Sequence, residues 1–242
     1  MTYCVGLLVD TGLVMLSDSR TNAGVDQIST FRKMAIFQRA GERALVLLSA
    51  GNLAITQAVV NLLHEASADG LADPPIHRAG NMFAAARVVG DALREVYGRD
   101  AAHLQDQGHE FNGTFILGGQ ISGEEPRLFH IYSAGNFVES SVDTPYFQMG
   151  ESKYGKPIID RVISRSSSLA QAAKCALVSM DSTIRSNLSV GAPLDLAIVR
   201  RDDYRVGTHL SIDMENDYFS KIRARWGEAL QEVFSELPDP NW

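Results

Sequence analysis

The spacing of hydrophobic residues changes several times along the chain, and each change marks a predicted element. Short runs rich in Val, Leu, Ile, Phe and Tyr predict strands. These runs cover residues 3–9, 13–17, 33–38, 43–50, 111–117, 127–132, 137–142, 146–149, 194–200 and 204–212. Apolar residues at helical spacing predict helices. These begin at Leu53 and cover 81–97, 152–164, 168–184 and 217–234. The polar stretch 20–30 predicts a loop, and Gly118-Gly119 predicts the end of a strand.

The order of these elements indicates the fold class. Strands come first, followed by a pair of helices, more strands, a second pair of helices, more strands and a tail helix. Such runs are typical of α+β proteins with antiparallel sheets, and two separate helix pairs favour a four-layer α/β/β/α sandwich. We expect a single domain over residues 1–242, with its C-terminal helix at about residues 215–236.

Composition excludes several classes of function. The formal net charge is −7 and no Lys/Arg run is present, which argues against binding to nucleic acid or to an anionic membrane. Two cysteines, Cys4 and Cys175, are too few for a disulfide framework, and the six histidines lack metal-ligand spacing. We therefore expect no metal and no cofactor. With no signal peptide or long apolar stretch, we expect the chain to be cytoplasmic.

Thr2 is the residue whose position suggests the most specific chemistry. Removal of Met1 would give Thr2 both a hydroxyl nucleophile and a free α-amine that can act as its base. An α-amine titrates near ~7.7–8.0, so roughly a third of it is neutral at about pH 7.5. For Lys33 to be the base instead, its pKa would have to fall by about three units, at a cost of roughly 4 kcal/mol. A charged Lys33, oriented by Asp18, has the easier task of stabilising the threonine oxygen.

Several of these residues also carry a family resemblance. Thr2, the 17–20 run Ser-Asp-Ser-Arg, Lys33 and the Ser49-Ala50-Gly51 step before a helix resemble proteasome β subunits and HslV, which are N-terminal-nucleophile hydrolases. The start Met-Thr-Tyr-Cys-Val-Gly-Leu-Leu and the run Ser-Asp-Ser-Arg-Thr-Asn-Ala-Gly-Val-Asp are most similar to the bacterial Anbu, or ancestral β-subunit, group. The family fold is an α/β/β/α sandwich, which agrees with the predicted order of elements.

The resemblance implies a role for each matching residue. Thr2 would be the nucleophile, Asp18 and Lys33 its charge pair, and the Gly51 N–H an oxyanion donor. A glycine before a helix suits that last role, because its N–H is unobstructed and lies at the positive end of the helix dipole. Contacts with the substrate are implied for four residues, Arg20, Thr21, Asn22 and Ser49. For Arg20, pairing with a carboxylate to support the structure is an equal alternative. The family also implies self-association into rings or related assemblies, without indicating a subunit number or an ATPase partner.

Two positions depart from the family pattern. The family has an Asp followed three residues later by a Ser, and the matching stretch Arg-Ser-Asn-Leu-Ser places Ser186 where the Asp is expected and Ser189 at the serine. A second family serine lies in a Gly-Ser-Gly step, whereas this chain has Gly150-Glu151-Ser152, so Ser152 is the candidate.

Three functions remain open. The first is a threonine-type peptidase; the second is an amidase or transferase acting on a non-peptide or conjugated amide; the third is an assembly platform with a weak site. Ser186 favours the third, and full retention of Met1 would do so strongly.

Overall fold

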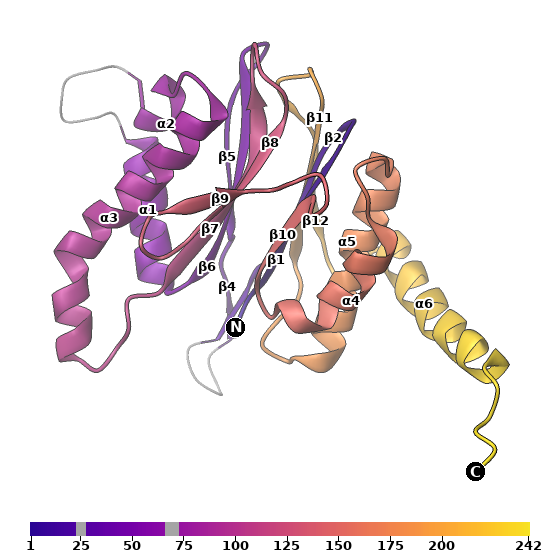
Figure 1. Ribbon diagram of the computed structural model, residues 1–242. Coiled ribbons are helices and arrows are strands. Elements are labelled where there is room, and N and C mark those ends of the chain that lie inside the picture. Colours follow the sequence, from indigo (N-terminus) through magenta and orange to yellow (C-terminus); the bar gives the residue numbers. More distant parts are fainter. Residues whose placement is uncertain (23–27, 66–72) are drawn as a thin grey trace.

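Two antiparallel sheets pack against each other between layers of helices in the computed structural model, which describes residues 1–22, 28–65 and 73–242 (Figure 1). The helices α1 (Leu53–His64), α2 (Pro75–Arg78) and α3 (Met82–Asp106) lie on one outer face. The helices α4 (Ser152–Val162) and α5 (Leu169–Ser186) lie on the other. The predicted α/β/β/α sandwich is confirmed.

The order of strands brings the two ends of the chain into the same sheet. The first sheet runs β10 (Tyr146–Gly150), β1 (Tyr3–Val9), β2 (Gly12–Asp18), β11 (Leu194–Arg200) and β12 (Val206–Ile212). The second runs β5 (Met34–Arg39), β6 (Arg43–Gly51), β7 (Gly113–Ile121), β8 (Arg127–Ile131) and β9 (Phe137–Glu139). Both β10 and β2 pair with β1, so the start of the chain lies in the interior of its sheet.

Burial on both faces explains why β1 and β2 are continuous apolar runs. Tyr3 and Val5 pack with the α4–α5 layer, whereas Cys4 and Met15 face the second sheet. Side chains alternate between the faces of a strand, so a central strand covered on both sides needs apolar residues at every position. This arrangement fixes the register of β1 and hence the position of Thr2 just before it.

Four predictions from the sequence need correction. The stretch 20–30, expected to be a loop, contains two short paired strands, β3 (Arg20–Asn22) and β4 (Ile28–Thr30). Strand β7 continues through Gly118-Gly119 instead of ending there, because β7 packs so closely on its neighbours that an added Cβ would collide with them. The short helix α2 was not expected, and α3 extends to Asp106 instead of ending near residue 97.

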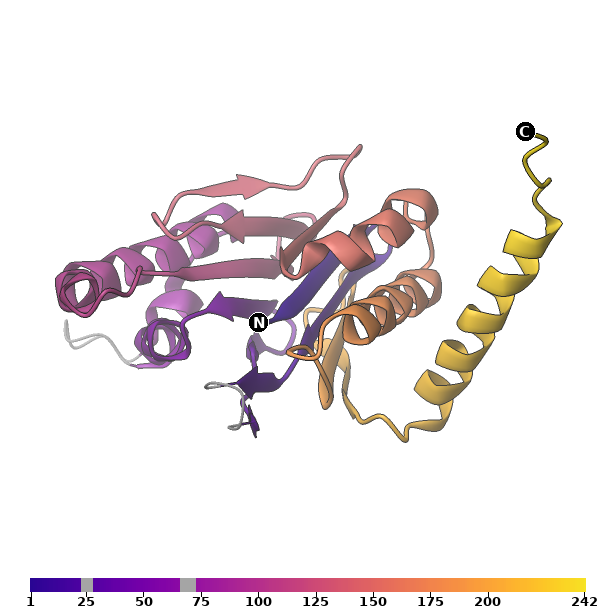
Figure 2. The same ribbon diagram turned by 90° about the horizontal axis from the view of Figure 1, so that it is seen from below.

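The tail helix α6 (Asp217–Glu236) is attached mainly through its first two turns. Phe219 is fully buried, and Arg223 donates a hydrogen bond of 2.6 Å to the buried Asp181 of α5. Beyond these turns α6 extends away from the body of the molecule (Figure 2). No helix of the described residues is both long and apolar enough to span a bilayer.

Candidate active site

A buried ion pair lies at the centre of the candidate site. Lys33 Nζ is 2.7 Å from Asp18 Oδ1, the Lys33 residue is 7% exposed, and Asp18 is fully buried. Lys33 Nζ also donates a hydrogen bond of 2.7 Å to the carbonyl oxygen of Arg20. Because two oxygens accept hydrogen bonds from its ammonium, Lys33 is held in position just before β5 (Met34–Arg39).

The Asp18 carboxylate accepts hydrogen bonds from three directions. Besides Lys33, the Tyr3 N–H donates to Oδ1 at 3.1 Å and the Gly191 N–H approaches Oδ2 at 3.4 Å. Burial raises the pKa of the Asp18 carboxyl, and the Lys33 ammonium and the two backbone N–H groups oppose that rise. Asp18 thereby joins Lys33 to the residue that follows Thr2.

The backbone of Thr2 is held in place by a hydrogen bond to its carbonyl oxygen. The Glu151 N–H donates to the Thr2 carbonyl oxygen at 2.8 Å, directly after β10. Gly150, which has φ +75°, makes this approach possible: a Cβ there would lie 1.8 Å from the Thr2 carbonyl oxygen. Thr2 is thus clamped between the turn at Gly150 and the first residue of β1.

Tyr3 anchors the other side of Thr2 and was not singled out from the sequence. Its side chain is fully buried, and its hydroxyl donates to Ser179 Oγ at 3.1 Å and accepts from Gln148 Nε2 at 2.5 Å. Gly155 leaves room for this hydroxyl, because a Cβ there would lie 2.3 Å from it. The only available signal was a tyrosine in an otherwise aliphatic strand, and its partners come from distant parts of the chain.

Gly51 lies where a strand becomes a helix, as the sequence predicts. It ends β6 with φ +115°, and a Cβ would lie 2.4 Å from the Asn112 carbonyl oxygen. The next residue, Asn52, caps α1 by accepting a hydrogen bond from the Ala54 N–H. The N–H of Gly51 therefore precedes the positive end of the α1 dipole.

One pocket of about 650 Å³ is lined by half of the predicted site residues. Its lining includes Thr2, Thr21, Lys33, Ser49 and Gly51. Met1 also lines this pocket, so its removal would enlarge the space in front of Thr2. The Thr21 hydroxyl is buried and, within the described part of the chain, has no hydrogen-bond partner.

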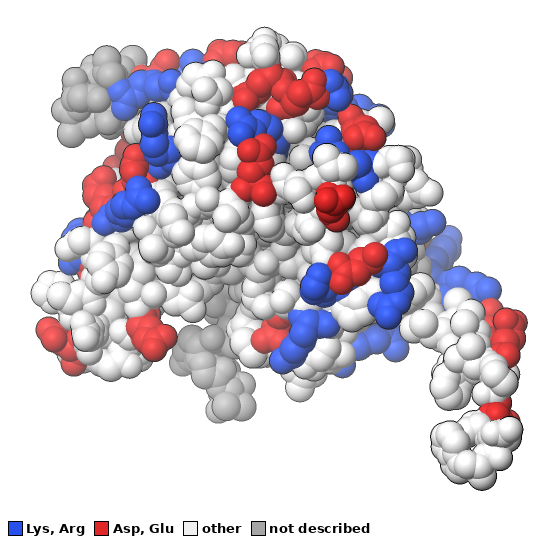
Figure 3. All heavy atoms as spheres, in the orientation of Figure 1, with Lys and Arg blue, Asp and Glu red and all other residues white. Residues whose placement is uncertain are grey.

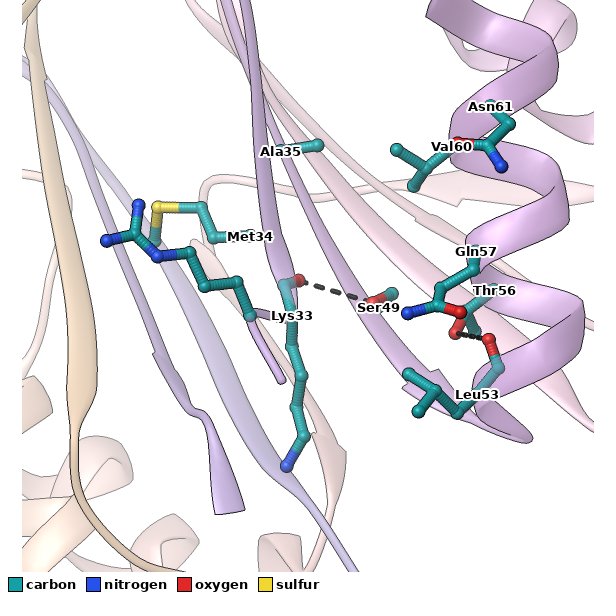
Figure 4. A pocket seen from close by; sticks show the side chains of 10 residues that line it. Lys33, Met34, Ala35, Ser49, Leu53, Thr56, Gln57, Val60 and Asn61 are labelled. Carbon is teal, nitrogen blue, oxygen red and sulfur yellow. Dashed lines mark hydrogen bonds between the residues drawn. The ribbon is translucent and has the colours of Figure 1, made fainter. Parts of the chain in front are cut away.

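A second pocket of about 360 Å³ adjoins the first and shares four lining residues with it, namely Lys33, Ser49, Leu53 and Thr56. Figure 4 shows Ala35 of β5 and Gln57 of α1 on opposite sides of Ser49, whose hydroxyl donates to the Lys33 carbonyl oxygen at 3.3 Å. Among the described residues, no acidic side chain lines either pocket. Among the described residues, the lining therefore offers no negatively charged partner for a basic group.

Arg20 supports a neighbouring turn and does not line either pocket. Its guanidinium donates to the Leu188 carbonyl oxygen at 2.9 Å and packs over Gly191, where a Cβ would lie 2.4 Å from Cζ. The Ser189 N–H donates to Asn187 Oδ1, which keeps Ser189 in this turn. This partner of Arg20 is a backbone carbonyl oxygen and not the carboxylate that the sequence suggested, and substrate contact by Arg20 stays a prediction.

The remaining predicted residues lie outside the pockets. Ser152 begins α4 after the clamp on Thr2, and its carbonyl oxygen accepts a long hydrogen bond of 3.5 Å from Gln148. Ser186 is exposed in the last turn of α5. Asn22 pairs with Ile28 through its backbone, and its side chain lies outside the described part of the structure.

The two cysteine thiols do not line either pocket, although Cys4 Sγ donates a hydrogen bond of 3.6 Å to the Ser49 carbonyl oxygen. Burial raises the pKa of the Cys4 thiol, which faces the interior between the sheets, and raises the pKa of Cys175 to about 11. In the described ranges, no group of three or more His, Cys, Asp or Glu side chains is arranged to hold a metal ion. The chemistry available at the pocket is therefore that of Thr2, Lys33, Asp18 and the backbone, and the imidazole of His109 also lines it.

Comparison with known proteins gave matches among solved structures. No family model and no curated protein matches the chain. "Anbu (ancestral beta-subunit) from Yersinia bercovieri" is 51% identical, with 99% of each chain covered and a TM-score of 0.91. An Anbu (Gly-1) mutant from Hyphomicrobium sp. strain MC1 is 48% identical over 100% of both chains, with a TM-score of 0.92. "Helical Assembly of the Anbu Complex from Pseudomonas aeruginosa" is 45% identical, covering 99% of this chain and 98% of that one, with a TM-score of 0.90.

Proposed function

The chain belongs to the Anbu, or ancestral β-subunit, family of proteasome-like N-terminal-nucleophile proteins, and we propose that it hydrolyses peptide bonds with Thr2 as nucleophile. One observation carries this proposal. The buried Lys33–Asp18 pair adjoins a pocket that Thr2 and Gly51 also line, and the Tyr3 N–H ties the carboxylate of that pair to the nucleophile's own strand.

The reaction follows from the groups at this pocket. Once Met1 is removed, the neutral α-amine of Thr2 takes the hydroxyl proton as Oγ attacks the substrate carbonyl carbon. The Gly51 N–H stabilises the oxyanion, and the Lys33 ammonium lowers the energy of the negative charge on the threonine oxygen. The amine then passes its proton to the leaving nitrogen, and an ester to Thr2 remains. Water, deprotonated by the same amine, hydrolyses the ester, and the proton returns to Oγ.

The substrate in this proposal is an extended peptide. Strand β3 pairs with β4 on one side, and Thr21 of β3 lines the pocket together with the end of β6. A peptide lying between Thr21 and the Ser49–Gly51 stretch would add to the backbone hydrogen bonding as a further strand. Because the described pocket linings contain no acidic side chain, we expect uncharged side chains next to the cleaved bond to be preferred over Lys or Arg.

We also propose that the chain assembles with copies of itself. The support is the relative from Pseudomonas aeruginosa, which is described as a helical assembly and is 45% identical over nearly the whole chain. Assembly and hydrolysis are separate proposals, because each can be measured without the other.

The decisive experiment compares the wild type with Thr2→Ala and Thr2→Ser. Intact-mass analysis first establishes the mature N-terminus, and a peptide carrying an electrophile then labels the protein. We expect one adduct in the wild type, an adduct in Thr2→Ser, and none in Thr2→Ala. Equal labelling of Thr2→Ala would overturn the assignment. Turnover limited to non-peptide amides would replace the peptidase proposal with an amidase, and full retention of Met1 would favour an assembly platform.

A further inference from the structure

A smaller cavity of about 220 Å³ adjoins the pocket that Thr2 lines. Asn52 lines both, so the two meet where β6 becomes α1. The walls of this cavity, here called the α1–α3 cavity, come from the first turn of α1 and the last turns of α3. Within the described structure its other lining residues are Ala54, Ile55, Asp100, His103 and Leu104. The sequence predicts no role for any of them.

The segment between α3 and β7 joins the two spaces. His109 lines the Thr2 pocket, and its N–H donates a hydrogen bond of 2.9 Å to the carbonyl oxygen of Leu104, which lines the α1–α3 cavity. Farther along, the Asn112 carbonyl oxygen accepts a hydrogen bond of 2.7 Å from the Asn52 N–H. Figure 1 shows this segment returning from the end of α3 to β7. Because backbone hydrogen bonds hold it against both walls, the pocket and the cavity form one continuous cleft.

The α1–α3 cavity offers apolar surface, and two of its polar groups already have partners. Three of its described lining residues are aliphatic. Asn52 Oδ1 accepts a hydrogen bond of 2.9 Å from the Ala54 N–H, and the Asp100 carboxylate accepts two from Arg99, at 2.8 and 3.0 Å. Figure 3 shows a mostly white surface at the lower left, where α3 ends, with red side chains set apart from one another. An apolar group that enters the cavity would displace water from aliphatic side chains without breaking these hydrogen bonds.

The size of the α1–α3 cavity suits one side chain. Pockets that enclose a whole small molecule measure roughly 300–1,000 Å³, and this cavity is smaller. When a peptide binds as an added strand, its backbone hydrogen bonds supply affinity and pockets for single side chains supply specificity. A peptide lying beside Thr21 and the Ser49–Gly51 stretch reaches this cavity by continuing past Asn52 and His109.

We propose that the α1–α3 cavity is a distal subsite for the substrate, and that it takes a large apolar side chain of the peptide whose bond Thr2 attacks. This side chain belongs to a residue that is not adjacent to the cleaved bond, because the cavity lies beyond Asn52 and is not lined by Thr2 or Lys33. The substrate class is therefore a peptide with an apolar residue a few positions from the bond. This inference rests on the proposed peptide hydrolysis and specifies the peptide.

Two matched variants test the subsite. Ala54→Phe fills the cavity, whereas Ala102→Phe adds the same ring to α3 outside the cavity and both pockets. Both alanines are exposed, so neither variant should unfold the domain, which circular dichroism will verify. Each protein cleaves a peptide library, and mass spectrometry of the products reads the residues on both sides of the bond. We expect the wild type and Ala102→Phe to prefer Leu or Phe over Gly at one non-adjacent position, at least fivefold in kcat/KM. Ala54→Phe should lose this preference, and an unchanged preference would overturn the proposal.

Peptide length separates a filled subsite from a general disturbance of the active site. Peptides shortened so that they end before the preferred position do not reach the cavity. The wild type and Ala54→Phe should therefore cleave these short peptides at equal rates and differ only on the long ones. An equal loss on short and long peptides would count against the subsite.

The outcomes separate this inference from the proposal on which it rests. Labelling that depends on Thr2, together with identical preferences in the wild type and Ala54→Phe, rejects the subsite alone. A wild type that cleaves no peptide rejects the hydrolysis. Fluorescence polarisation with the long peptides then tests the cavity by itself, and equal binding to Ala54→Phe and Ala102→Phe rejects it.

Discussion

Replacing Gly150 with Ala should displace the proposed nucleophile without touching any reactive group. Gly150 has φ +75°, a conformation that costs an alanine about 1–2 kcal/mol. In addition, the new Cβ would lie 1.8 Å from the Thr2 carbonyl oxygen, which must move by more than 1 Å to reach an ordinary contact. That movement breaks the 2.8 Å hydrogen bond from the Glu151 N–H, and leaving a buried N–H unpaired costs about 1–3 kcal/mol. The sum is about 2–5 kcal/mol.

Gly41 offers a matched control for the backbone cost alone. It has φ +77°, and nothing lies within 4 Å of an added Cβ. We expect Gly41→Ala to lose about 1–2 kcal/mol in urea unfolding and to keep full labelling of Thr2 by a peptide electrophile. Gly150→Ala should lose more stability and most of the labelling rate. Equal losses of stability, with labelling intact in both variants, would refute the clamp on Thr2.

Three further predictions concern buried ionisable groups. Asp18→Asn and Lys33→Met should each lower the free energy of unfolding in urea by about 3–5 kcal/mol, because each leaves a buried group without its partner. The double variant should lose less than the sum of the two single losses. Additive losses would contradict the pairing. Cys175, whose pKa is raised to about 11 by burial, should react with iodoacetamide at pH 8 on the order of 100-fold more slowly than a peptide thiol, and the rate should rise with pH. A rate equal to that of the peptide thiol would contradict the raised pKa of Cys175. Burial lowers the pKa of His130, and its Nε2 is buried without a hydrogen-bond partner within the described residues. The unfolded chain therefore binds the proton more readily, so stability should fall as the pH drops below ~6.5 and fall less in His130→Phe; parallel pH curves for the two proteins would exclude this.

The elements of the fold were largely predictable because hydrophobic spacing reports burial directly. Strand β1 and the start of α1 lie where the sequence places them, because both depend on local patterns. The glycines at 118 and 119 gave the wrong signal. Glycine is typical of turns, but here it allows close packing inside a strand: a Cβ at Gly118 would lie 2.9 Å from the sulfur of Met15, and one at Gly119 would lie 2.2 Å from the Ala44 carbonyl oxygen. The sequence alone does not distinguish these two uses of glycine.

In the candidate site, the reactive residues could be predicted from the sequence, but the contacts that position them could not. Thr2, Asp18, Lys33 and Gly51 could be proposed from residue chemistry and resemblance, because their types and spacing carry the information. The groups that hold them could not be inferred, because almost every residue type has a backbone N–H and the sequence does not show which of them donates to a given side chain. The Gly191 N–H approaches Asp18 from 173 positions away in the chain, and no pattern near either residue indicates that contact.

The turn after α5 helps to hold the ion pair without the side chain of Ser186, the residue that the resemblance places at the aspartate of β subunits. Three consecutive residues bind this turn: Asp18 accepts from the Gly191 N–H, Ser19 donates to the Pro193 carbonyl oxygen at 2.5 Å, and Arg20 donates to the Leu188 carbonyl oxygen. Lys33 in turn binds Asp18 and the Arg20 carbonyl oxygen. None of these contacts involves residue 186, whose side chain is exposed. The hydrogen bonds that hold the Lys33–Asp18 pair therefore do not depend on the side chain of residue 186.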